Sequence, residues 1–138
     1  MVTHSRTAAD LEFRRAFEAG EILPGEFNHL AHLRLAYVCL VEGGPDSAQR
    51  QMRRSLLAFL DAHHIPREKF HETLTRAWVM AVAHFMNRAH SASFAEFAAN
   101  SSPLLNSQVM LTHYSHEKLF SASARAAFVA PDLEAIPL

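Results

Sequence analysis

Residues Lys69–Met86, KFHETLTRAWVMAVAHFM, form the longest run of the chain with few helix-breaking residues. The run starts with polar side chains, His71, Glu72 and Thr75 among them, and then becomes almost entirely apolar. On a helix, residues three or four apart share a face, so His71, Thr75 and Trp78 would lie near one stripe. The pattern predicts a buried helix whose polar start carries side chains suited to catalysis or ligand binding.

A second segment, Asn28–Val41, NHLAHLRLAYVCLV, has the same character. It is apolar on nearly all sides, which is typical of a central, buried helix, and Asn28 is a favourable N-cap. Its first turn carries His29 and His32. Two apolar helices that both begin with histidines can pack together and bring those histidines to one place. We therefore expect a helix over residues 28–42 to pack against a helix over residues 67–88 at the centre of the molecule.

The rest of the chain also has helical patterns, separated by glycine and proline. No alternating pattern is long enough for a sheet. The predicted fold class is all-α, a compact single-domain helical bundle over residues 1–138, with residues 1–6 frayed and residues 129–138 an extended C-terminal tail. Further helices are expected over residues 8–19, 45–63, 94–100 and 121–128, and another that restarts at Ser102-Pro103 and runs through Val109 and Met110.

Composition narrows the classes of partner. The chain has 138 residues, 49% of them hydrophobic, and a formal net charge of -1, which suits one domain with a proper core and argues against nucleic acid or an anionic membrane surface as the main partner. Its single cysteine, Cys39, has no disulfide partner, and the residues MVTHSRTAADLEF lack the apolar stretch expected of a signal peptide. The longest apolar run, Ala77–Ala83, is far shorter than the ~20 residues that span a bilayer. We expect a cytoplasmic protein without a membrane partner; the sequence leaves the oligomeric state open.

Ten of the residues are histidines, and three of them suggest a metal site. His29 and His32 are spaced i, i+3, which lets two side chains of one helix reach one ion. His71, at the start of the other buried helix, would be the third ligand and would leave a position open for water or substrate, as in catalytic zinc sites. Nitrogen ligands suit Zn, Fe, Ni or Cu alike. The spacing predicts a divalent transition metal held by His29, His32 and His71.

Glu72 and Arg34 are the candidate catalytic residues beside this site. A guanidinium within an apolar helix needs a carboxylate, and Glu72 is the expected partner of Arg34. Glu72 has two other possible roles: a surface pair with Arg76, or an outer-shell partner of a ligand histidine and general base. With Arg34 as an anion anchor, the favoured hypothesis is metal-assisted chemistry, hydrolytic or oxidative, on a small anionic molecule.

A different class of function is also open. In this alternative the protein is a non-enzymatic module that binds a small ligand or a partner protein, and its histidines are hydrogen-bonded core residues. A DNA-binding helical regulator is disfavoured by the charge balance.

Three segments, FNHLAHLRLAY, FHETLTRAW and YSHEKLFSASARAAFVAPDL, resemble the motifs of a family of small, uncharacterised bacterial proteins. That family carries F-x-H-x-x-H-L-R, YHET-T-x-x-W and a Tyr-Ser…Ala-Arg…Pro-Asp-Leu ending, and the resemblance covers most of residues 27–133. The chain departs from it at Phe70, where the family has tyrosine. The family brings no activity with it, but the resemblance adds Tyr114 to the candidate catalytic residues. The functional positions that it implies are Phe27, His29, His32, Arg34, His71, Glu72, Thr73, Thr75, Trp78, Tyr114, Ser115 and Arg125.

Overall fold

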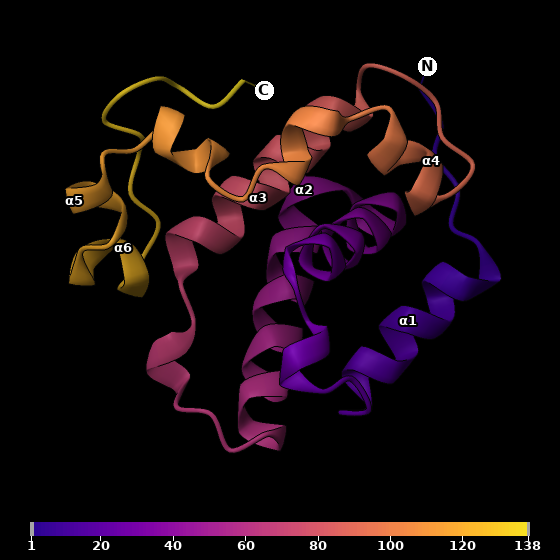
Figure 1. Cartoon of the computed structure of the whole chain (residues 1–138), viewed down its shortest axis with the longest axis horizontal. Coiled ribbons are helices and arrows are strands. Elements are labelled where there is room, and N and C mark those ends of the chain that lie inside the picture. The colour runs from indigo at the N-terminus through magenta and orange to yellow at the C-terminus, as the bar shows by residue number, and fades with distance from the viewer. Residues whose placement is uncertain (1, 138) are drawn as a thin grey trace.

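A computed structural model describes residues 2–137 of the chain, and its regular elements are all helical (Figure 1). Within these residues the only β-type pairing is an isolated parallel bridge between His4 and Ser91. The all-α prediction is confirmed. The α-helices are α1 (Ala8–Glu18), α2 (His29–Ala62), α3 (Glu72–Met86), α4 (Phe94–Ala99), α5 (His116–Leu119) and α6 (Ala122–Ala126).

Helix α2 is bent so sharply at Gly44 that its two halves fold back on each other. Gly44 has φ 79° and ψ −180°, a conformation that essentially only glycine adopts, and Pro45 suits the first turn of the half that follows. The rings of Phe27 and Phe59, at the two ends of α2, have centroids 5.3 Å apart, whereas a straight helix would separate these positions by about 48 Å. The expected helix stop at Gly43-Gly44 is therefore confirmed as a bend inside α2.

The core lies where α2 packs against α3, the most extensive contact between any two elements. The central pairing of these two helices is thus as predicted. Helices α1 and α4 lie on one side of α2, and α5 and α6 lie on the other side, beside α3 (Figure 1). The large apolar side chains that the two central helices bury completely are Leu33, Leu35, Tyr37, Val38, Met52, Val79 and Val82.

Helix α3 begins later than predicted. The helix expected from residue 67 is interrupted: Arg67–Lys69 form a single 3₁₀ turn, and α3 begins at Glu72. The reason is His71, which has extended backbone angles (φ −127°, ψ 102°) and accepts a hydrogen bond from the backbone N–H of Leu74 through its ring. His71 is therefore the N-cap of α3 rather than a residue of its first turn.

The predicted helix after Ser102 is also wrong. The structure has two separate 3₁₀ turns there, Ser102–Leu105 and Val109–Thr112. Between them, the side chain of Asn106 accepts a hydrogen bond from the backbone N–H of Gln108 at 3.0 Å. Such a local bond competes with helical pairing and is a common reason for a helix to stop.

Parts of both ends of the chain are more ordered than predicted. Met1 and Leu138 lie outside the described residues, but the segment that follows Met1 is not frayed: the backbone N–H of Ser5 donates to the carbonyl of Ser91 at 2.9 Å. In the C-terminal tail, Ile136 is buried, whereas Leu133 is 58% exposed. Within residues 2–137, no helix combines the length and apolar character needed to cross a membrane.

Candidate ligand pocket

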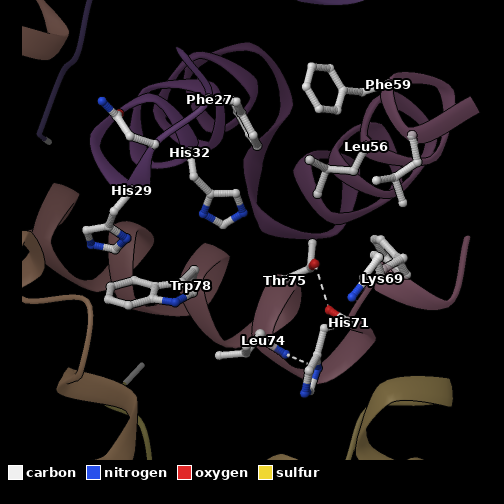
Figure 2. Close-up of a pocket in the computed structure, with 13 residues that line it drawn as sticks. Phe27, His29, His32, Leu56, Phe59, Lys69, His71, Leu74, Thr75 and Trp78 are labelled. Atoms are coloured by element: carbon white, nitrogen blue, oxygen red, sulfur yellow. Dashed lines mark hydrogen bonds between the residues drawn. The ribbon is translucent and has the colours of Figure 1, made fainter. Parts of the chain in front are cut away.

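A pocket of about 370 Å³ lies between the start of α2, the end of α2 and the start of α3 (Figure 2). The bend at Gly44 creates it, because the bend carries the last turns of α2 back beside its first turn. Most lining side chains are apolar or aromatic, and the volume is in the range of small-molecule sites. The lining residues are Phe27, Asn28, His29, His32, Leu56, Phe59, Leu60, Lys69, Phe70, His71, Leu74, Thr75 and Trp78.

The three predicted metal ligands all line this pocket, but two of them already have backbone partners. The Nε2 of His71 donates to the carbonyl of Leu119 at 2.7 Å, and its Nδ1 accepts from the backbone N–H of Leu74 at 3.1 Å. His71 must therefore be neutral, and burial lowers its pKa. His29 pairs its Nε2 with the carbonyl of Leu104 at 2.8 Å.

His32 differs from the other two. In the part of the chain that the structure describes, neither ring nitrogen of His32 has a hydrogen-bond partner. Figure 2 shows its ring between α2 and α3, pointing into the pocket, while the His71 ring points away from it. Burial, reinforced by nearby His29, lowers the pKa of His32 from 6.5 to about 4. At neutral pH His32 therefore offers one N–H donor and one nitrogen lone pair to the pocket.

The positions and hydrogen bonds of the three histidines determine whether they can share one metal ion. No group of three or more His, Cys, Asp or Glu side chains within residues 2–137 is placed to hold one ion. The two ring nitrogens of His71 are both engaged, so ligation by His71 would require one of its hydrogen bonds to break. A metal held jointly by His29, His32 and His71 stays a prediction.

The charged lining of the pocket is positive. Lys69 lies at its rim and has no ion-pair partner among the described residues, and the lining contains no aspartate or glutamate. The hydroxyl of Thr75 donates to the carbonyl of His71 at 2.8 Å, which leaves its oxygen able to accept a further bond. The pocket thus combines an apolar body, a neutral imidazole and one ammonium group.

Arg34 does not reach this pocket, and its expected pairing with Glu72 is wrong. Its Nε and Nη2 both lie 3.0 Å from Oδ1 of Asp10, and its guanidinium sits over the ring of Phe13. Asp10 is only 3% exposed. Its other oxygen accepts from the backbone N–H groups of Thr7 and Phe94 at 3.0 and 3.1 Å. These hydrogen bonds hold the Asp10 pKa below its ordinary value even though burial, the largest single influence, opposes them.

Glu72 is also directed elsewhere. Its carboxylate lies 3.4 Å from Nε of Arg53 and accepts from the side-chain amide of Gln49 at 3.3 Å. It pairs with neither Arg34 nor Arg76, and it makes no hydrogen bond to a histidine of the described chain. Arg76 instead lies over the ring of Phe128. None of the three roles considered for Glu72 matches these contacts.

Tyr114 is fully buried away from the pocket, and its hydroxyl donates to the carbonyl of Val129 at 2.7 Å. Two other positions that the family resemblance implied also anchor the C-terminal segment. Thr73 donates to the carbonyl of Ala127 and accepts from the N–H of Val129, and Ser115 donates to Asp132. Those that line the pocket are Phe27, His29, His32, His71, Thr75 and Trp78.

Two groups of pocket residues were missed by sequence reasoning. Leu56 and Phe59 belong to the second half of α2, and their approach to His32 depends on the direction of the bend at Gly44. Lys69 lies in a segment predicted to be continuous helix. A signal for the bend was present in Gly43-Gly44-Pro45, but it marks a break without giving its angle.

No family model matches this chain, and neither the curated proteins nor the solved structures include one with significant similarity to it. The resemblance to the bacterial family therefore stays a prediction, and the function must be argued from the pocket itself.

Proposed function

We propose that this protein binds a small molecule with a planar apolar body and a negatively charged group in the pocket described above, which we call the His32 pocket. The observation that carries the proposal is the unpartnered ring of His32 in a largely apolar cavity. The His32 side chain is partly exposed, so water reaches its ring nitrogens when the pocket is empty. A ligand that fills the pocket displaces this water, and it binds well only if it accepts from, or donates to, the His32 ring in its place.

The other lining residues support the rest of the ligand description. The aromatic rings of Phe27, Phe59 and Trp78 offer flat surfaces for a planar group. Lys69 can attract an anion, and no lining carboxylate repels one. Such a mixture of apolar walls and a few convergent polar groups is typical of small-molecule sites.

The proposal is for binding rather than for a reaction. The three side chains considered for catalysis, Arg34, Glu72 and Tyr114, are all engaged outside the pocket. We also propose a cytoplasmic location, because the lone Cys39 is a buried free thiol, which suits a reducing compartment.

Trp78 makes the proposal testable, since it is the only tryptophan of the chain and lines the pocket. Anilinonaphthalene sulfonate has the proposed character, a planar aromatic body with an anionic group. We expect it to quench Trp78 fluorescence with a Kd below about 100 µM. Leu56→Phe, which narrows the pocket, should weaken binding at least about tenfold, a loss of ~1.4 kcal/mol.

The matched control is Leu30→Phe, because Leu30 is 48% exposed on the first half of α2 and does not line the pocket. This variant should bind the dye as the wild type does. Equal weakening by both variants, or no quenching at all, would remove the proposal.

A metal titration distinguishes the alternative function. Tag-free protein, stripped with chelator, is titrated with Zn²⁺ by calorimetry. Uptake of one ion per chain that is abolished by both His32→Gln and His71→Ala would favour the shared metal site. Heat that is absent, or unaffected by His71→Ala, would leave the small-molecule pocket as the better account.

A further inference from the structure

A second concave surface lies on the outer face of the last turns of α2. It is a groove of about 520 Å³ with arginine side chains along it, and we call it the arginine groove. Arg50, Arg53 and Arg54 come from successive turns of α2, and Arg67 comes from the segment after it. Leu57, Ala58 and Asp61 complete the lining.

The arginines of this groove outnumber the carboxylates that neutralise them. Arg67 forms a two-point pair with Asp61, at 3.1 and 2.7 Å, and Arg53 lies 3.4 Å from Glu72. Arg50 and Arg54 have no ion-pair partner within residues 2–137. They are spaced i, i+4, so their like charges face each other on the helix and repel.

An anion in the groove would relieve this repulsion. Guanidinium groups bind phosphate oxygens through paired N–H donors, and they keep their charge at any physiological pH. Asp61 and Glu72 restrain Arg67 and Arg53 on either side, which leaves Arg50 and Arg54 free to close on a ligand. We propose that the arginine groove binds a small polyphosphate anion, such as the di- or triphosphate group of a nucleotide.

Two observations favour a small ligand over a large one. The formal net charge of the chain is -1, which does not favour binding of a long polyanion such as a nucleic acid. None of the large, exposed apolar side chains of the described residues lines the groove, so nothing beside it would insert into a lipid surface.

The arginine groove is separate from the His32 pocket. Leu56, Phe59 and Leu60 of α2 face the pocket, whereas Leu57, Ala58 and Asp61 face the groove. The inference therefore does not rest on the function proposed above, and each site can be tested without the other.

The test is calorimetric titration of the full chain with inorganic triphosphate at low salt. We expect saturable binding to the wild type, and binding at least about tenfold weaker in the double variant Arg50→Gln/Arg54→Gln, since charge-assisted hydrogen bonds are lost. The matched control is Arg76→Gln/Arg88→Gln. It removes the same charge from two exposed arginines that stack on Phe128 and Phe85, outside the groove, and should bind within about twofold of the wild type, since only screened long-range charge changes.

Three results would overturn the proposal. The first is no binding by the wild type at millimolar triphosphate. The second is equal weakening in the two double variants, which would indicate attraction to overall charge. The third is tighter binding of a single-stranded oligonucleotide than of triphosphate, which would indicate a nucleic acid ligand. Both Arg50 and Arg54 are exposed, so the variants should fold, and circular dichroism checks this.

Discussion

Arg34 and His32 stand two residues apart on α2 and face opposite sides of it, and the two sides are built differently. On the Arg34 side, the guanidinium and the Asp10 carboxylate pair with each other, and Asp10 also accepts from two backbone N–H groups. On the other side, His32 faces a cavity and has no partner among the described residues. The same apolar helix thus carries one polar group that stabilises the fold and one that is free to bind.

The largest expected effect is on the Arg34 side. Asp10→Ala should lower the free energy of unfolding by about 3 kcal/mol, because it strands a partly buried guanidinium and the backbone N–H of Phe94. Urea unfolding measures this. Glu72→Gln is the control: it breaks a pair with a largely exposed arginine and should cost about 0.5 kcal/mol or less. Similar losses in both variants would erase the distinction between the two carboxylates.

The second-largest change in stability is expected at Gly44, because the bend there brings the two halves of α2 together around the pocket. Gly44→Ala should destabilise the protein by about 2 kcal/mol, since the backbone angles there are strained for any residue with a Cβ. The cost is in the backbone alone, because nothing lies within 4 Å of an added Cβ. Gly25→Ala also meets nothing within 4 Å and lacks the positive φ, so its urea midpoint should stay unchanged. A neutral Gly44→Ala would mean that the bend is different in solution.

His71 lines the same pocket as His32 but is predicted to matter for stability. His71→Ala removes the N-cap of α3 and strands the Leu119 carbonyl, which should cost about 1–2 kcal/mol. His71→Asn should recover part of the loss, because asparagine is a good N-cap. If alanine costs nothing in chelator but abolishes metal-dependent stabilisation, His71 is a ligand and the sequence-based metal site is restored.

The smallest change in stability is expected at His32. At pH 7, His32→Gln should shift the free energy of unfolding by less than about 1 kcal/mol, because no protein hydrogen bond is lost. The contribution of His32 to stability should appear at acidic pH. The folded state holds the pKa of His32 near 4, below its ordinary 6.5, so the unfolded state binds the proton first and stability falls as pH drops from 6.5 toward 4.

His32→Gln should flatten this fall without removing it, because the pKa of His71 is lowered in the same direction. Urea unfolding from pH 7 to pH 4 gives the two curves. Parallel curves would mean that His32 already carries its proton, or is solvated, in the folded state.

Much of the fold could be predicted from sequence because its signals are local. The Asn28 N-cap and the break at Gly43-Gly44-Pro45 are each read from a few neighbouring residues, and each is present. The start of α3 was misplaced because histidine is an uncommon N-cap, and only the bond from Leu74 shows it in that role.

The candidate site could be predicted only in part. The histidines at the starts of two apolar helices do line one pocket. This could be predicted because periodicity shows which residues of a helix share a face. What each ring nitrogen contacts depends on carbonyl groups far away in the chain, Leu104 for His29 and Leu119 for His71. Likewise, nothing in the spacing of Arg34 indicates that its carboxylate is Asp10 rather than Glu72.

The most direct test of the account is the NMR titration of histidine ring nitrogens in ¹⁵N-labelled protein, with and without anilinonaphthalene sulfonate. We predict that His32 is neutral down to about pH 4, that its ring signals shift when the dye binds, and that those of His71 do not. A His32 ring that titrates near pH 6.5 and does not respond to the dye would contradict the claim that His32 is the free polar group of a ligand pocket.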